Sequence, residues 1–149
     1  MTPEHFTQLI QKKGPQLRQL MMRTLPVKAG TIAQSFFKDN FRQSGFVDNS
    51  LLRWKRSKRQ DNPKDKDRNY KTLLSRRNHL FNSIRKRTQP FTAIIFTDVI
   101  YAQVHNEGGT AGRRGHSFIM PKRQFIGESR SLNRLISSKI EQEVESLFK

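Results

Sequence analysis

The most informative stretch of the chain is Tyr101-Ala-Gln-Val-His-Asn-Glu-Gly-Gly109, and a second one, Ile119-Met-Pro-Lys-Arg-Gln-Phe-Ile-Gly127, follows it closely. The first reads as Tyr-Ala-x-x-His-x-x-Gly and the second as Pro-x-Arg-x-Phe-Ile-Gly. In such patterns proline and glycine fix turns, arginine bonds carboxylates or carbonyls, and the phenylalanine, here Phe125, is expected to anchor the last helix to the sheet. The residues of both stretches are therefore predicted to hold the fold rather than to touch a substrate. They are Tyr101, Ala102, His105, Gly108, Pro121, Arg123, Phe125 and Gly127.

The sequence around these stretches predicts an α+β fold. Short apolar runs bounded by turn residues predict strands, which should form a small, mostly antiparallel sheet in the second half of the chain. The expected strands are 80–87, 91–97 and 117–120, with a turn at 88–90 and a flexible Gly/Arg loop at 108–115. Short helices are expected near residues 70–74 and 99–104.

Longer helices are predicted at both ends of the chain. Apolar residues recur at helical spacing through the N-terminal third, where Gly14-Pro15 and Pro26 are expected to break or bound the helices. At the other end, an apolar stripe over residues 132–148 predicts an amphipathic helix that is capped by Ser129 or Ser131.

Composition limits the class of protein. With 149 residues the chain is expected to form a single domain, 1–149, with a basic flexible loop at about 53–69. Its hydrophobic content of 34% predicts a thin core, of a kind often completed by partner subunits. Cysteine is absent, so no disulfide or thiolate metal site is expected. No apolar run is long enough for a membrane span, and no signal peptide is visible, which predicts a soluble protein made in the cytoplasm.

Positive charge is concentrated between residues 53 and 87, where 14 Lys and Arg residues stand against three Asp residues, within a total net charge of +17. Such a field favours an acidic partner, either nucleic acid or an acidic protein surface. Trp54 and Tyr70 flank the loop, so a ring could stack on a base while cations contact phosphates. No named nucleic-acid-binding module fits the tract. The candidate polyanion or partner contacts are Lys55, Arg56, Lys58, Arg59, Lys64, Lys66 and Arg68.

Patterns for catalysis are missing from the sequence. The four histidines, His5, His79, His105 and His116, show no metal-ligand spacing, and His105 is expected to be a structural residue in a turn. There is no nucleophile motif and no phosphate-binding glycine loop, and the glycine run at 108–112 lacks the setting of a dinucleotide site. We therefore expect no enzyme, no metal and no cofactor.

Taken in order, these landmarks resemble the Mu-like phage virion morphogenesis (tail completion) family. The resemblance covers roughly residues 30–148 and rests on the two stretches quoted above, on Trp54 before a variable loop, and on the segment 73–84. Three positions depart from the family pattern: Asn78 stands where a glycine is usual, Asn106 where a glutamine is usual, and Lys122 where a small residue is common. Asparagine also accepts positive φ, so the first change is tolerable.

The resemblance implies a non-enzymatic phage or prophage structural protein that completes the tail or the head–tail junction, as one subunit of a ring and without a cofactor. The expected partners are tail and head–tail connector proteins and further copies of the chain, with non-specific contact to DNA in the channel and no membrane. The expected location is the virion, at the head–tail junction or the tail end, and the bacterial cytoplasm during assembly. The alternative, from charge alone, is a basic nucleic-acid-binding module.

Overall fold

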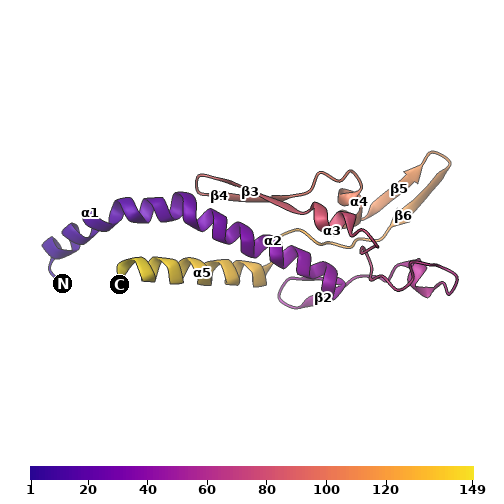
Figure 1. Cartoon of the computed structure of the whole chain (residues 1–149), viewed down its shortest axis with the longest axis horizontal. Coiled ribbons are helices and arrows are strands. Elements are labelled where there is room, and N and C mark those ends of the chain that lie inside the picture. Colours follow the sequence, from indigo (N-terminus) through magenta and orange to yellow (C-terminus); the bar gives the residue numbers. More distant parts are fainter.

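A helical rod begins the chain in the computed structural model, which describes residues 1–149. It consists of α1 (Pro3–Gln19), the π-helical turn η1 (Leu20–Thr24) and α2 (Leu25–Gln43), which follow one another without a loop (Figure 1). Thr2 caps its start, because the Thr2 side chain accepts a hydrogen bond from the His5 amide and a proline occupies the first helical position. The predicted N-terminal helices are thus present, but they form one rod.

The helix does not end at Pro15, whereas Pro26 marks a helix boundary as predicted, although the rod continues through it without a loop. Pro15 lies inside α1, which has no buried residue, so water can bond the carbonyl that the proline leaves free. Pro26 lies in the first turn of α2, just after the wider π-helical turn, and cannot donate to the carbonyl of Met22. That carbonyl instead accepts the amide of Phe91, at 3.1 Å, from the tip of a β-hairpin.

Three separate antiparallel hairpins follow the rod. Their strands are β1 (Gly45–Val47) with β2 (Leu51–Arg53), β3 (Arg85–Gln89) with β4 (Thr92–Phe96), and β5 (Gly109–Arg113) with β6 (His116–Met120). The predicted α+β class is confirmed, with antiparallel strands in the second half, but the strands pair in twos rather than in one sheet. The first hairpin was missed because strands of three residues give almost no alternation to read.

Short helices separate the hairpins. They are η2 (Lys58–Asp61), α3 (His79–Ser83) and α4 (Ala102–Glu107). The predicted strand 80–87 is half wrong, because its first residues belong to α3 and only Arg85 onward pairs with β4. The segment 70–74 forms turns and no helix, and the predicted Gly/Arg loop 108–115 is mostly strand β5. Its glycines Gly109 and Gly112 have φ of 117° and 98°, which explains why the segment reads as a loop.

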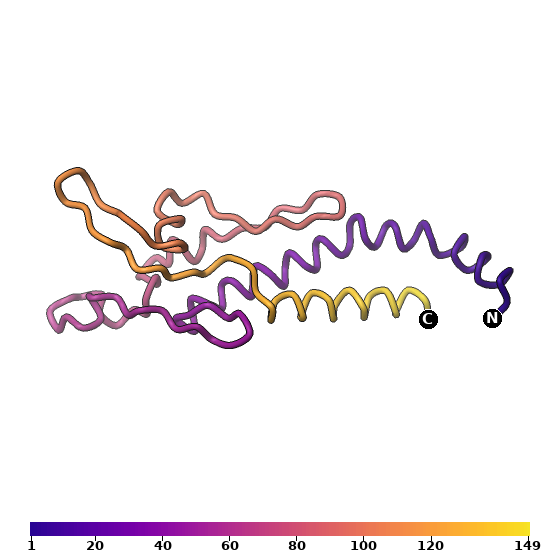
Figure 2. The backbone as a smooth tube through the Cα atoms, turned by 180° about the vertical axis from the view of Figure 1, so that it is seen from behind, coloured from indigo at the N-terminus to yellow at the C-terminus, as the bar shows by residue number.

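The C-terminal helix α5 (Arg130–Phe148) is confirmed, and Ser129 is its cap, accepting from the amide of Leu132. The helix runs back along the rod, so both chain ends lie at one end of an elongated molecule (Figure 2). Lys28 of α2 binds the carboxylate of Glu143 of α5 and fastens the two helices together, while Lys139, one turn before Glu143 in α5, binds the same carboxylate. None of the helices combines the length and the apolar character that a membrane crossing requires.

The core is thin, as predicted, with 19 of 149 residues buried. One cluster lies at the C-terminal end of α2, around Phe41, Trp54, Leu80, Ile84, Ala102 and Phe125. A second, smaller cluster joins α2 to α5 through Ala33, Phe37, Phe46 and Leu132. The N-terminal half of the rod and the β5–β6 hairpin contribute nothing to either cluster, so much apolar surface stays exposed.

The basic segment 53–69 lies at the far end of the molecule from the chain termini (Figure 1). It contains one ordered turn, η2, where Ser57 and Gln60 form a capping box. At the start of the segment the amide of Trp54 donates to the carbonyl of Ser44 at 2.9 Å, whereas after η2 the backbone hydrogen bonds join residues three apart, from Asp65 to Asn62 and from Arg68 to Asp65. Its mobility stays a prediction.

Candidate functional site

The motif residues of the two stretches and the candidate polyanion contacts of the basic loop meet at Arg123. This side chain is 7% exposed, and its Nε donates to the carbonyl of Lys55 at 2.8 Å while Nη2 donates to the carbonyl of Arg56 at 3.2 Å. Arg123 forms no ion pair, so its bonds go to carbonyls, one of the two options that the sequence left open. The attachment of the basic loop to the body of the molecule therefore depends on a buried cation.

Burial without a carboxylate has an electrostatic consequence. Desolvation, and after it the positive charge of Arg59, lower the pKa of Arg123 from its ordinary value. Arg59 itself is partly buried: its Nη2 donates to the carbonyls of Lys71, at 3.0 Å, and Leu74, while its Nε has no partner. Two arginines thus hold the base of the basic loop through main-chain oxygens.

Asn106 joins the two sequence stretches. Its Oδ1 accepts the amides of Phe125 at 2.9 Å and Ile126 at 3.0 Å, and its Nδ2 donates to the carbonyl of Ile126 at 3.1 Å. The carbonyl of His105 accepts the amide of Arg123 at 2.7 Å and extends this ladder. In the sequence, Asn106 stood out only as a departure from the family pattern. An asparagine side chain can, however, both donate to a backbone carbonyl and accept from backbone amides of an extended segment.

Phe125 and Trp54 fill the core beneath this junction. The ring of Phe125 is 1% exposed and lies 5.0 Å from that of Phe41, which also meets Trp54 edge to face at 5.7 Å. The indole Nε1 of Trp54 donates to the carbonyl of Gln124 at 2.8 Å. Trp54 is therefore a core residue and cannot stack on a base, which leaves Tyr70 as the only ring of the predicted pair near the surface.

Phe125 also receives support from α2. Asn40, which is fully buried, donates to the carbonyl of Phe125 at 3.1 Å and accepts the amide of Val47 at 3.1 Å. The expectation was that Phe125 anchors the last helix to the sheet. Its contacts instead join the end of α2 to the segment before α5, because the strands form no common sheet that it could pack on.

The remaining motif residues serve the same junction. Ala102 is buried in the core, whereas Pro121 is half-buried. Gly108 has φ of 75°, and a Cβ there would lie 2.9 Å from the amide nitrogen of Lys122, so the close approach of the two stretches requires glycine. A Cβ on Gly127 would likewise collide with the side chain of Gln124, although that side chain can move.

Tyr101 and His105 stand at the outer edge of the junction. The Tyr101 ring is 41% exposed and lies between His79, at 6.2 Å, and His105, at 5.9 Å. His105 lies in α4 rather than in a turn, and its Nδ1 is buried with no hydrogen-bond partner. Burial, and after it the charge of Arg123, lower the pKa of His105 below its ordinary value of 6.5.

The lowered pKa of His105 predicts a loss of stability in mild acid. As the pH falls through 6.5, His105 becomes protonated in the unfolded chain but stays neutral in the folded chain, whose pKa is lower. The free energy of unfolding is therefore highest above pH 6.5 and declines below it until the pKa of the folded chain is reached. Urea unfolding of the wild type and of His105→Gln at one pH on each side of 6.5 measures this. The variant should lose less stability than the wild type, and equal losses would contradict the assignment.

The candidate polyanion contacts divide into two groups. Arg56 pairs with Asp61 at 3.2 Å, Arg68 donates to the carbonyl of Pro63 at 3.3 Å, and Arg59 is bound as described above. The other four are exposed and form no ion pair or side-chain hydrogen bond: Lys55, Lys58, Lys64 and Lys66. These four lysines are the cations that the loop offers to a partner.

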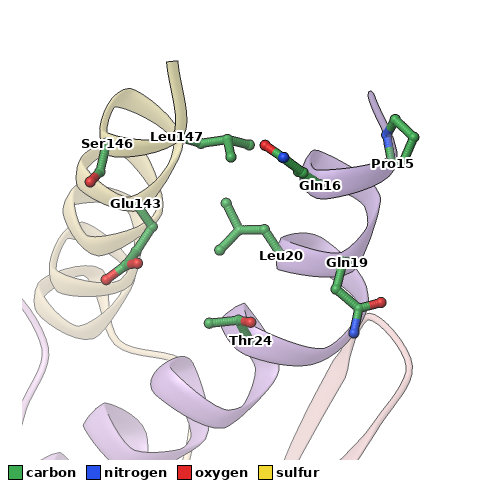
Figure 3. Close-up of a pocket in the computed structure, with 8 residues that line it drawn as sticks. All are labelled: Pro15, Gln16, Gln19, Leu20, Thr24, Glu143, Ser146 and Leu147. Atoms are coloured by element: carbon green, nitrogen blue, oxygen red, sulfur yellow. The ribbon is translucent and has the colours of Figure 1, made fainter. Parts of the chain in front are cut away.

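No three His, Cys, Asp or Glu side chains lie close enough together to hold a metal ion. A cleft of about 530 Å³ opens between the rod and α5, where Leu20 and Leu147 point toward the space between the helices (Figure 3). Its one acid, Glu143, is bound by Lys28 and then by Lys139, and both bonds lower its pKa, so the cleft contains no free acid or base.

A family model of phage virion morphogenesis proteins matches residues 4–145, nearly the whole chain. The chain belongs to the phage virion morphogenesis family. No curated protein and no solved structure matches it significantly. As a phage virion morphogenesis protein it has a role in building the phage particle, and proteins of this family are typically structural and associated with the virion.

Proposed function

We propose that this phage virion morphogenesis protein is a non-enzymatic subunit that completes the tail or the head–tail junction, and that it works as a ring of identical copies. Its partners would be tail and head–tail connector proteins. The observation that carries the proposal is the large surface of the single chain. Family membership supplies the setting, which is assembly of the virion.

The single chain exposes more surface than a compact monomer of its mass would. The chain exposes 10668 Å² at a mass of 17.5 kDa, whereas a compact monomer of this mass exposes about 7,900 Å². The excess of roughly 2,800 Å² is of the size that obligate subunit interfaces bury. A subunit whose surface is partly covered by its neighbours exposes this much area when alone, whereas a self-contained enzyme or binding domain of this length does not need to.

The exposed apolar side chains support the same reading. Ile100 is 96% exposed, Ile119 75%, and Phe6 56%, and they lie on three different elements or loops. Each has a second exposed apolar residue close to it in the chain, namely Tyr101, Phe118 and Ile10, and contiguous apolar surface marks places where partners dock. A ring subunit needs at least two such surfaces for its two neighbours, and further ones for the structures above and below the ring.

The proposal is tested in the phage or prophage that carries the gene. Without the gene, heads and tails should accumulate unjoined or unfinished in electron micrographs, and the purified chain added to such an extract should restore infectious particles. Normal joined virions in the absence of the protein would overturn the proposal. Loss of DNA replication or of gene expression, with no defect in particle assembly, would favour the basic nucleic-acid-binding alternative.

The basic loop is proposed to meet acidic partner surfaces or DNA in the channel. Changing its four unpaired lysines to serine should leave the free energy of unfolding unchanged within about 0.5 kcal/mol, because exposed charges without partners contribute little. Joining to purified tails should weaken about tenfold or more and lose much of its salt dependence, since surface charge steers such encounters. The changes are Lys55→Ser, Lys58→Ser, Lys64→Ser and Lys66→Ser.

A matched control removes the same charge elsewhere. Lys12, Arg18, Arg23 and Lys149 are exposed and unpaired and lie away from the loop, so their change to serine should affect joining much less. Equal effects of the two variants would show that net charge, not the loop, matters. Tight, sequence-selective binding of duplex DNA that the loop variant loses, with joining intact, would reject the structural role of the loop.

A further inference from the structure

We propose that the β5–β6 hairpin of one copy docks in an apolar groove on the opposite part of the next copy, between β3–β4 and α5, and that this head-to-tail contact builds the ring. The inference rests on the proposed function, because it names the two surfaces by which copies join. The occupant of the groove is thus a second copy of this chain.

The hairpin carries unpartnered apolar side chains on both of its faces. In the register of the pair, Phe118 lies opposite Ala111 on one face and Ile119 lies opposite Thr110 on the other. Phe118 is 53% exposed and Ile119 is 75% exposed. A two-stranded hairpin with solvent on both faces normally carries polar residues on both of them. Phe118 and Ile119 therefore point to a binding site that covers both faces of the hairpin.

The hairpin also lacks support within its own copy. It pairs with no other strand, and its main neighbour is the short helix α4. A lone two-stranded hairpin is marginally stable in water, and three of its residues, Gly109, Gly112 and Gly115, have positive φ. Docking in a neighbour would supply the packing that the copy itself does not provide.

The groove is apolar. It is a pocket of about 340 Å³ lined almost entirely by apolar side chains. Leu25 and Pro26 of α2 line it together with Phe91 and Ala93 of the β3–β4 hairpin and with Ile140 and Val144 of α5. A hairpin inserted edge-on would bring Phe118 and Ile119 against these apolar side chains.

Charges beside the two surfaces are complementary. Arg113 and Arg114 at the tip of the hairpin are exposed and form no ion pair. Glu141 and Glu145 follow Ile140 and Val144 by one position each, so they form an adjacent acidic ridge along the groove, exposed and unpaired. In a chain of net charge +17 an acidic ridge is uncommon, and it lies where the arginines of a docked hairpin would arrive.

The placement of the surfaces leads to a ring. The β5–β6 hairpin projects away from the body, whereas the groove lies toward the end where the chain termini are (Figures 1 and 2). The hairpin therefore cannot fill the groove of its own copy. Two different surfaces on opposite parts of one molecule make a heterologous contact, which repeats from copy to copy and closes when the rotation per step allows it.

Disulfide trapping tests the contact, because the natural chain has no cysteine. Mixing Ile119→Cys with Ile140→Cys under mild oxidation should give a covalent dimer of one copy of each. The double variant in one chain should give a ladder of multimers that ends at the ring. The matched control pairs Ile119→Cys with Leu135→Cys, which is also exposed and on α5 but does not line the groove, and it should give little dimer.

A second test blocks each surface in turn. The hairpin variant Phe118→Ser/Ile119→Ser and the groove variant Ile140→Lys should each lose the assembly that light scattering detects for the wild type, with unchanged circular dichroism. Mixed together they should form one-to-one dimers that grow no further, since only one intact hairpin meets one intact groove. Ile100→Ser, which removes a more exposed side chain outside both surfaces, should assemble like the wild type.

The charge pairing has its own variants. Arg113→Glu/Arg114→Glu should weaken assembly, and adding Glu141→Lys/Glu145→Lys in the same chain should restore it. If the wild type assembles but residue 119 does not cross-link to 140, or links equally well to 135 or to itself, the docking inference fails and the ring stands. If the wild type stays monomeric and no cross-link forms, the ring of the proposed function fails as well.

Discussion

Replacing Phe125 by alanine is expected to lower the free energy of unfolding by about 3–5 kcal/mol, the usual cost of removing a buried ring. The ring is 1% exposed and packs at 5.0 Å on Phe41 in the larger of two small clusters. Neighbouring elements cannot easily close the gap, because the amide and carbonyl groups on either side of the ring are held by Asn106 and Asn40. Urea denaturation at a protein concentration where the chain is monomeric measures the loss.

A loss of this size would consume a large part of the 5–15 kcal/mol by which domains are typically stable. Phe118→Ala is the matched control, since it removes the same ring from a position that is 53% exposed, and it should cost less than about 1 kcal/mol in the monomer. If Phe125→Ala melts like the wild type but fails to assemble, Phe125 belongs to an interface and not to the core.

Asn106→Ala is the second substitution with a large expected effect, about 2–5 kcal/mol. It removes three hydrogen bonds and leaves the amides of Phe125 and Ile126 without their acceptor, and an unsatisfied buried amide costs about 1–3 kcal/mol. Asn106→Asp separates the accepted hydrogen bonds from the donated one, because a carboxylate still accepts from the amides of Phe125 and Ile126 but cannot donate to the carbonyl of Ile126.

The aspartate variant should therefore be clearly more stable than the alanine variant when both are unfolded in urea. In the hydrogen-exchange profile, the amides of residues 125 and 126 should remain protected in Asn106→Asp and lose protection in Asn106→Ala. Equal stability of alanine variant and wild type would mean that water replaces the asparagine at the junction.

The sequence predicted those parts of the fold in which one element carries its own signal. The apolar stripe of α5 and its Ser129 cap, the strand around β4 and the helical N-terminal third are of this kind. A break or kink at Pro15 and a boundary at Pro26 were expected because a proline rule treats each helix alone. Whether a lost hydrogen bond matters depends on the surroundings, which here are solvent in one case and the tip of a hairpin in the other.

The site was predictable in its motif residues but not in its connections. Arg123 and Phe125 were expected to hold the fold, yet no local pattern reveals that the guanidinium reaches carbonyls 67 and 68 residues earlier in the chain. Arg59 looks like any other cation of the basic tract, and only the structure separates it from the free lysines. Trp54 looked like a stacking platform because its neighbours are basic, whereas its burial depends on helices far away in sequence.

Pro26 gives the rod a chemical role beyond its shape. A helix carbonyl normally accepts a hydrogen bond from an amide about one turn later in the same helix. Because proline has no amide hydrogen, the carbonyl of Met22 instead accepts the amide of Phe91, 69 positions later in the chain. The backbone of Phe91 has φ of 61°. The turn of β3–β4 is thereby tethered to the helix through one shared acceptor. A residue with an amide hydrogen at position 26 would compete with Phe91 for that oxygen, and Pro26 and Phe91 both line the apolar groove.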